Sequence, residues 1–208
     1  MLTFLYVAVT GYFIGSIPSA YIAGRIAGID IRQSGSGNVG ATNVARVLGK
    51  RFGYPVFVID VAKGFIAVKL AEALAGAAHF SPFLVDLCGV VGAMFAVIGH
   101  SFPVWLGFKG GKGVATSIGS LFALNWIPAL VVGMVWIVMF LTTRYVSLAS
   151  IVATISLPIA VGLMLFLKEL PSPVLFYFSL VLAAIVVFRH RSNISRLLSG
   201  TEHRFVRK

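Results

Sequence analysis

Four long apolar runs, almost free of charge, most constrain what this chain can fold into. Residues 1–23, 146–167 and 173–188 hold no charged side chain, and residues 83–108 hold only one. A helix needs about 17–25 mostly apolar residues to cross about 30 Å of hydrocarbon. Charged residues make up 11% of the 208 residues, against about 25% in soluble domains. The sequence therefore predicts an all-α, polytopic membrane protein.

The apolar pattern predicts seven transmembrane helices, at about residues 3–25, 54–76, 83–105, 112–126, 128–143, 147–167 and 173–190. Residues 112–143 fit either one kinked span or two short spans divided at "NWIP". Cytosolic loops of membrane proteins retain Lys and Arg, so the cations decide between the two. Six spans would move Arg144 and the C-terminal basic cluster to the outside, which favours seven.

Seven spans with the N-terminus outside and the C-terminus in the cytosol gather most cations on the cytosolic face. They are 14 of the 17 Lys and Arg residues: Arg25, Arg32, Arg46, Lys50, Arg51, Lys109, Lys112, Arg144, Arg189, Arg191, Arg196, Arg204, Arg207 and Lys208. The net charge of +11 then faces an anionic lipid leaflet, and nucleic-acid binding does not follow from it. No cation precedes the first run, so we expect a retained span rather than a cleaved signal peptide. The lone Cys88 forms no internal disulfide.

The segment "SGSGNVGATN" at residues 34–43 is polar and rich in glycine. Residues 35–40 match the dinucleotide fingerprint G-x-G-x-x-G, but they follow a membrane helix rather than a strand, which argues against that fold. Glycine amides with Ser, Thr and Asn donors still suit an anion, and the guanidinium of Arg46 suits phosphate. The alternative is a flexible loop.

A second glycine-rich segment, "GFKGGKGVAT" at residues 107–116, precedes another predicted helix. It is not a Walker A loop, because Lys112 is followed by Gly113. Glycine amides, lysines and a helix N-terminus would favour phosphate here. The alternative is a basic turn that marks the cytosolic side. Two such segments on one face predict two phosphate groups or one large anion.

The tail "RHRSNISRLLSGTEHR" at residues 189–204 adds a third polar segment on the same face. His190 and Asn193 are three residues apart, so a continuing helix would place them on one face. We expect Glu202 to pair with one of the surrounding arginines. Ser147, at the start of the sixth predicted helix, has a helix N-cap as its simplest role.

Three titratable groups within or beside the predicted spans have two interpretations each. Asp60 and Lys63 stand at i and i+3 inside a span, where an ionisable pair is either functional or mutually neutralising. His100, at the end of the third predicted span, is either functional or merely interfacial. The sequence leaves these alternatives open.

The three segments with Arg46 resemble the motifs of the bacterial acyl-phosphate:glycerol-3-phosphate acyltransferases, the PlsY family. The resemblance covers essentially the whole chain, in size, predicted spans, motif order and motif facing. It implies one integral membrane acyltransferase domain over residues 1–208, in the bacterial inner membrane with its active site facing the cytosol. The implied reaction moves a fatty acyl group from acyl phosphate to the 1-hydroxyl of glycerol 3-phosphate. Lysophosphatidic acid and inorganic phosphate are the products, in the first step of phospholipid synthesis.

The resemblance also implies the site residues. The catalytic set is Ser36, Arg46, Lys112, His190 and Asn193. The substrate-binding set is Gly37, Asn38, Gly40, Thr42, Asn43, Lys109, Gly110, Gly111, Gly113 and Ser147. Residues 36–40 would cradle the acyl phosphate, and the glycines of residues 110–113 would hold glycerol 3-phosphate. The base is either His190 or a substrate phosphate oxygen.

The residues fit this chemistry without a cofactor. Acyl phosphate is an activated anhydride, so positioning two anions is most of the catalytic work. The chain has no His-x4-Asp acyltransferase pattern and no cluster of metal-ligating residues. A phosphometabolite carrier would need a polar path to the far side or inverted repeats, and neither is evident. A lipid-binding scaffold would explain the basic tail but not two glycine-rich segments.

Overall fold

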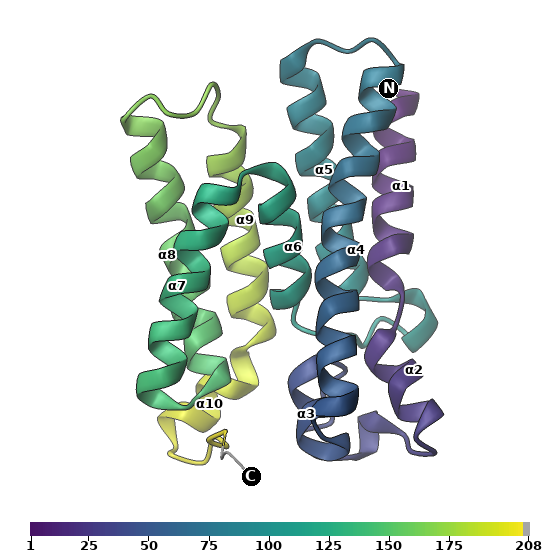
Figure 1. Ribbon diagram of the computed structural model, residues 1–208, viewed down its shortest axis with the longest axis vertical. Coiled ribbons are helices and arrows are strands. Elements are labelled where there is room, and N and C mark those ends of the chain that lie inside the picture. Colours follow the sequence, from purple (N-terminus) through teal and green to yellow (C-terminus); the bar gives the residue numbers. More distant parts are fainter. Residues whose placement is uncertain (206–208) are drawn as a thin grey trace. The chain divides into compact units, whose positions relative to one another are not determined.

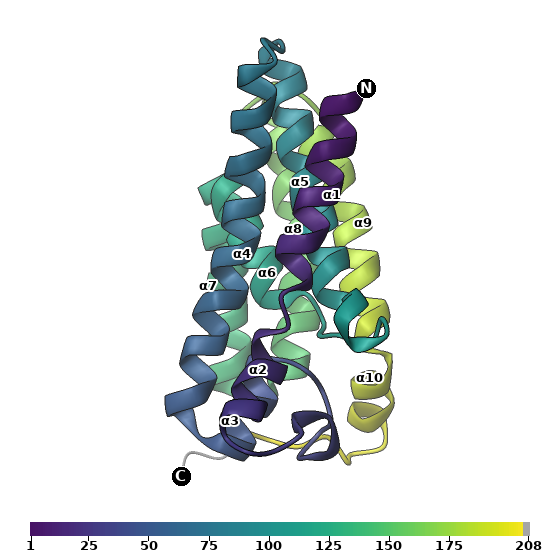
Figure 2. The same cartoon turned by 90° about the vertical axis from the view of Figure 1, so that its right-hand side faces the viewer.

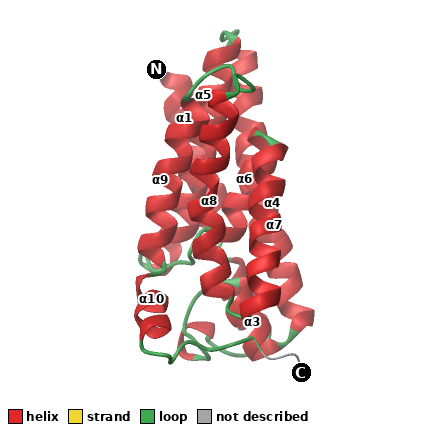
Figure 3. Ribbon diagram, turned by 90° about the vertical axis from the view of Figure 1, so that its left-hand side faces the viewer, coloured by secondary structure: helices red, strands yellow, loops and turns green. Residues whose placement is uncertain are grey.

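In the computed structural model, which describes residues 1–205, every regular element is a helix (Figure 3). The elements are α1 (Leu2–Ser16), α2 (Ser19–Ile26), η1 (Ile31–Gln33), α3 (Ala41–Leu48), α4 (Lys50–Ala77), α5 (Pro82–Ser101), η2 (Val104–Leu106), α6 (Val114–Leu124), α7 (Trp126–Thr143), α8 (Val146–Phe166), α9 (Val174–Arg189) and α10 (Arg191–Leu198). The chain divides into two compact units, Met1–Leu124 and Asn125–Lys208. The predicted cytosolic cations Arg207 and Lys208 lie outside the described residues.

The first unit is built on α1, α4 and α5, which lie side by side, and α6 packs against α4 (Figure 1). Glycines stand where these helices meet. A methyl group on Gly15 would overlap the backbone of Ala96, and one on Gly64 would overlap the backbone of Thr116. In lipid, helices associate through such close packing, because burial from water no longer drives it. α2 and α3 pack against α4 at one end of this unit, with the polar segment between them (Figure 2).

The second unit consists of α7, α8 and α9, with α10 packed against α8 and α9. Its buried side chains include Leu157 and Val161 of α8 and Phe178 of α9. The indole Nε1 of Trp136 in α7 donates to Ser150 Oγ of α8 at 3.1 Å. A polar bond of this kind is satisfied within the protein and needs no water, as the interior of a membrane requires.

A helix occurs at each of the seven predicted ranges, with three differences in detail. The first predicted helix is broken at Ile17 and Pro18 into α1 and α2, because proline supplies no N–H to continue it. The ambiguous stretch 112–143 forms two helices, divided at Asn125, whose side chain caps α7 by accepting from Ile127 N at 3.1 Å. The last helix does not continue into the tail: α9 ends at Arg189, and α10 turns from it by 59°.

Four helical stretches of the described chain are long and apolar enough to cross a membrane. They are Leu2–Ile26, Pro82–Leu106, Trp126–Thr143 and Val146–Phe166, and the bent pair Val174–Arg189 and Arg191–Leu198 makes a fifth. Of the other predicted spans, α4 is long but has charged side chains at positions 60, 63, 69 and 72, and α6 has only 11 residues. The number of crossings and the direction of the termini therefore stay predictions.

Candidate active site

The first glycine-rich segment folds around the buried side chain of Asn43 on α3. Its Oδ1 accepts from Ser36 N at 2.8 Å, and its Nδ2 donates to Ser34 O at 3.0 Å and to Ile31 O at 3.3 Å. Gly35 has a φ of +61°, and a methyl group there would overlap Asn43, so only glycine fits. The amide of Asn43 thus shapes the loop, and its predicted contact with substrate stays a prediction.

The outer side of this loop leaves several predicted site groups accessible. Ser36 and Arg46 are exposed, while Asn38 and Thr42 are partly buried. Gly40 is the N-cap of α3 and provides no capping side chain, so the first turn of α3 directs its N–H groups out of the helix end. The exposed hydroxyl of Ser36 and the N-terminus of α3 favour an anion at this loop, and the exposed guanidinium of Arg46 lies in the last turn of the same helix.

A second cation, Arg32, lies just before this segment and is paired with a carboxylate. Arg32 donates side-chain and backbone hydrogen bonds to Asp30, which lower the pKa of the Asp30 carboxyl to about 2. The ion pair has an N–O distance of 2.6 Å. Arg32 is therefore engaged locally, whereas the predicted phosphate ligand of this segment is Arg46.

The second glycine-rich segment closes back on the end of α5. Gly110 N donates to Ser101 O at 3.2 Å, and Gly111 N donates to His100 O at 3.0 Å. Both glycines are buried, and a methyl group on Gly111 would overlap the imidazole of His100. These glycines thus permit close packing, and the two amides that the sequence assigned to phosphate already bind carbonyls. Lys112 follows directly, and α6 begins two residues later.

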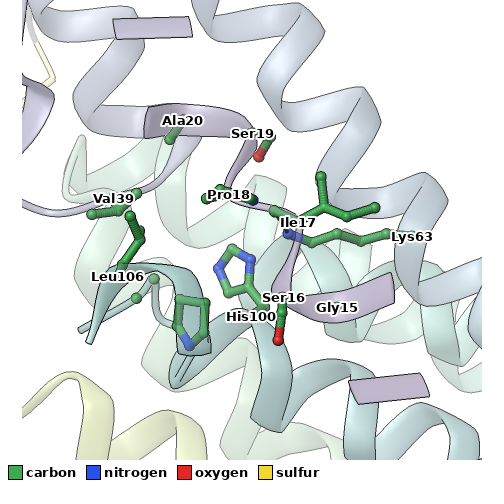
Figure 4. Close-up of a pocket in the computed structure, with 13 residues that line it drawn as sticks. Gly15, Ser16, Ile17, Pro18, Ser19, Ala20, Val39, Lys63, His100 and Leu106 are labelled. Carbon is green, nitrogen blue, oxygen red and sulfur yellow. Dashed lines mark hydrogen bonds between the residues drawn. The ribbon is translucent and has the colours of Figure 1, made fainter. Parts of the chain in front are cut away.

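The structure brings the two glycine-rich segments together within the first unit. Val39 of the first segment and Gly110 and Gly111 of the second line one small cavity with His100 (Figure 4). The cavity measures about 10 Å³, enough for about one water molecule. Val39 also packs in one apolar cluster with Leu106, just before the second segment. Two segments that lie more than sixty residues apart in the sequence therefore share a wall.

In the second unit, Glu202 organises the remaining predicted residues. Its Oε1 accepts from Ser147 Oγ and from Asn193 Nδ2, each at 2.7 Å, and its Oε2 accepts from Arg196 Nε at 2.7 Å. Burial raises the pKa of this carboxyl, but the three hydrogen bonds outweigh burial and lower the pKa below its usual value. An ionised Glu202 therefore holds α8, α10 and the tail together.

This cluster confirms one sequence prediction and corrects another. Glu202 does pair with an arginine, Arg196. Ser147 is not the N-cap of α8: that position is Tyr145, and the Ser147 hydroxyl donates to Glu202 instead. Sequence reasoning missed this role because 55 residues separate the two partners.

His190 stands at the bend between α9 and α10 and is only 2% exposed. Its Nδ1 lies 2.8 Å from Val186 O. A carbonyl oxygen can only accept, so Nδ1 carries a hydrogen, and in the neutral ring Nε2 is then the proton acceptor. The helix does not continue straight from α9 through Asn193, because it bends by 59° at His190. Both residues are nevertheless buried, at the start of α10.

The three titratable groups that the sequence left open lie close together inside the first unit. Asp60 and Lys63 form an ion pair at 2.8 Å, and His100 Nδ1 lies 3.6 Å from Asp60 Oδ1. No signal in the sequence links His100 to this pair, since 40 residues separate it from Asp60.

Comparison with known proteins finds one family. Residues 5–200 match the family model described as glycerol-3-phosphate acyltransferase. A glycerol-3-phosphate acyltransferase from Aquifex aeolicus is 45% identical over 201 residues, 97% of this chain and 98% of that protein. One from a Synechococcus species is 46% identical over 209 residues, 100% of this chain and 98% of that protein.

Two crystal structures also match along nearly the whole chain. Both are of PlsY, an integral membrane glycerol 3-phosphate acyltransferase. Its glycerol 3-phosphate form has a TM-score of 0.85 and 43% identity, covering 98% of this chain and 96% of that one. Its lysophosphatidic acid form has a TM-score of 0.82 and 42% identity, covering 98% and 95%.

Proposed function

Because this chain belongs to the glycerol-3-phosphate acyltransferase family, we propose that it acylates glycerol 3-phosphate with acyl phosphate as donor. The 1-hydroxyl oxygen attacks the acyl carbonyl carbon, and the bond from that carbon to the phosphate oxygen breaks. Lysophosphatidic acid and inorganic phosphate leave. A phosphometabolite carrier would release glycerol 3-phosphate unchanged, so formation of the acylated product distinguishes an acyltransferase from a carrier.

The observation that carries this proposal is the shared wall of the two glycine-rich segments. Both substrates carry a phosphate, and each segment leads into a helix with a cation nearby: Arg46 lies in the last turn of α3, and Lys112 lies two residues before α6. Two anions repel each other in water, so a site that neutralises both raises their effective concentration. The neighbouring PlsY structures, with glycerol 3-phosphate and lysophosphatidic acid forms, support the same pair of substrate and product.

The proposed roles follow from the local geometry. Ser36, Gly37, Asn38, Gly40 and Thr42 cradle the acyl phosphate and the oxyanion of the transition state, on the loop that Asn43 shapes.

Lys112, with Lys109 and the N-terminus of α6, binds glycerol 3-phosphate. Gly110, Gly111 and Gly113 let this segment pack closely against the end of α5, because a methyl group on Gly110 or Gly111 would overlap His100. The amides of residues 110 and 111 already donate to backbone carbonyls, so we do not assign them to the phosphate. In the second unit, Ser147 and Asn193 have the proposed role of binding substrate, in the orientation that Glu202 gives them.

The proton of the glycerol hydroxyl has two acceptors in this proposal. His190 is one candidate base, and Nε2 is the nitrogen that would take the proton in the neutral ring, because Nδ1 is bound to Val186 O. A phosphate oxygen of the substrate, with a pKa near 6, is the acceptor that we favour. His190 then orients substrate without taking the proton.

We further propose seven membrane crossings, with the N-terminus outside and the catalytic segments at the cytosolic face of the bacterial inner membrane. The distribution of 14 of 17 cations supports this orientation. We also propose that residues 1–208 act as a single acyltransferase domain and that the acyl chain reaches the site from the inner leaflet.

The direct test incubates the purified protein with palmitoyl phosphate and radiolabelled glycerol 3-phosphate. We expect radiolabelled lysophosphatidic acid and an equal amount of inorganic phosphate. Phosphate release without labelled lipid would mean that water, not glycerol 3-phosphate, is the acceptor, and would contradict the proposal.

A further inference from the structure

A buried cluster of charged and polar side chains lies directly behind the two glycine-rich segments. We call Asp60, Lys63, Ser19 and His100 the buried hub. Asp60 is 1% exposed and Lys63 is 4% exposed, and both belong to α4, inside a predicted span. Charges so deeply buried are costly unless they are paired, and they are usually retained for a purpose.

The hub holds the break between α1 and α2. Ser19 Oγ, in the first turn of α2, donates to Asp60 Oδ1 at 2.6 Å. Lys63 Nζ donates to Ile17 O at 3.0 Å, and the same carbonyl at the break accepts from Ser19 N at 3.0 Å (Figure 4). α2 leads into the first glycine-rich segment, and Ala20 and Ala23 of α2 pack in one apolar cluster with Val39. The hub therefore fixes one end of that segment.

The hub also reaches the second glycine-rich segment, through His100. The imidazole Nδ1 lies 3.6 Å from Asp60 Oδ1, beyond hydrogen-bond distance but within reach of an ion pair when the ring is protonated. The far side of the ring lies against Gly111, where a methyl group would overlap Nε2. Gly111 N donates to the backbone carbonyl of the same His100. The ring and the main chain of one residue thus position the segment that precedes Lys112.

We propose that the buried hub positions the two glycine-rich segments relative to each other, with His100 and Asp60 as positioning residues. The contacts of the hub link the start of α2, through Ser19 and Ile17, to the end of α5, through His100. None of its members is among the predicted catalytic or substrate-binding residues. The kinetic part of this inference rests on the proposed function, whereas the structural part does not.

The test uses His100→Gln, Asp60→Asn and Ser19→Ala in the full chain, purified in detergent. Matched controls are Lys69→Gln and Glu72→Gln, because this pair has the same i, i+3 spacing on the same helix and the same 2.8 Å distance, but its side chains are 47% and 25% exposed. Backbone amide hydrogen exchange is measured by mass spectrometry over residues 31–40, 107–116 and, as an internal reference, 146–166.

We expect His100→Gln and Asp60→Asn to speed exchange in residues 107–116 about 10-fold or more. Ser19→Ala should do the same in residues 31–40. Exchange in the reference helix should stay unchanged. In the acyltransferase assay, the KM for glycerol 3-phosphate should rise about 10-fold in His100→Gln with kcat within about 3-fold. Both controls should stay within 2-fold in every measurement.

The outcomes separate the two proposals. If the wild-type chain does not acylate glycerol 3-phosphate, the proposed function fails, and the exchange data still decide on the hub. If folded His100→Gln and Ser19→Ala show wild-type exchange in both segments, the inference is wrong whatever the activity. These two variants leave the Asp60–Lys63 pair in place, so they decide the question even if Asp60→Asn does not fold.

Discussion

The carboxylate of Glu202 gives the sharpest single perturbation in the second unit. Glu202→Gln keeps the size of the side chain and one carbonyl oxygen, which still accepts from Ser147 and Asn193. It replaces Oε2 by an amide that faces another donor, Arg196 Nε. The variant thus loses the hydrogen bond from Arg196, and the hydrogen bonds from Ser147 and Asn193 no longer have a charged acceptor.

The magnitude follows from the bonds that are lost. A hydrogen bond to a charged group contributes about 1.5–3 kcal/mol, against about 1 kcal/mol for a neutral one. Arg196 is 37% exposed, so its bond belongs at the low end of that range. We expect a loss of about 2 kcal/mol in the free energy that docks the tail, or about a 30-fold rise in its opening equilibrium.

Hydrogen exchange over residues 190–204 measures this opening, and Glu169→Gln is the matched control. Glu169 is exposed, in the loop between α8 and α9 of the same unit. Because Ser147 and Asn193 lose their orientation, kcat/KM should fall about 10- to 100-fold in Glu202→Gln and less than 2-fold in the control. Unchanged exchange together with unchanged kcat/KM in Glu202→Gln would refute this account of the tail.

The same carboxylate predicts a dependence on pH. The pKa of Glu202 is lowered from its ordinary value of 4.5 in the folded chain. Its stabilisation of the tail is therefore complete above about pH 4.5 and is lost as the pH falls through the folded-state pKa. Exchange over residues 190–204, corrected for intrinsic rates, should rise only at such acidic pH in the wild type and should lack this rise in Glu202→Gln. A wild-type rise centred above pH 5 would contradict the assignment.

The remaining predictions concern the phosphate ligands, the base and the topology. Arg46→Ala and Lys112→Ala should each lower kcat/KM about 30- to 1000-fold, or about 2–4 kcal/mol. Lys112→Arg need not restore activity, because a planar guanidinium does not fit where an ammonium binds. A loss of less than 3-fold in both alanine variants would exclude the proposed phosphate binding by these residues. In His190→Ala, the acid limb of the single-turnover pH–rate profile should survive at a reduced rate; its disappearance would make His190 the base. A cysteine at Lys50 should react with an impermeant thiol reagent only after the inner face is opened, and one at Ser81 should react in intact cells; labelling of both from outside would exclude seven spans.

The helices were predictable because their signal is local. Apolar runs in the sequence place a helix at each of the seven ranges, and "NWIP" marks the division that Asn125 makes by capping α7. The break at Pro18 and the bend at His190 were missed, because both lie inside or at the end of continuous apolar runs. The hydropathy of a run does not show where the helix axis changes direction.

The sequence identifies the candidate site segments by their composition, but it does not show which side chains contact each other. The segments with Ser36, Arg46 and Lys112 stand out as glycine next to cations. The packing of Gly111 on His100 does not, since a glycine that donates to phosphate and one that admits a ring look alike in sequence. Asp60 and Ser19 are 41 residues apart, so only the fold reveals that they meet.

The measurement that tests the central claim most directly is a comparison of donors. The purified chain is given glycerol 3-phosphate with palmitoyl phosphate, with palmitoyl-CoA or with palmitoyl acyl carrier protein, each as sole donor at equal concentration. Because the proposed site neutralises the phosphates of both substrates, we expect lysophosphatidic acid to form with palmitoyl phosphate and not with the other two donors. Comparable formation of lysophosphatidic acid with palmitoyl-CoA as sole donor would contradict the account.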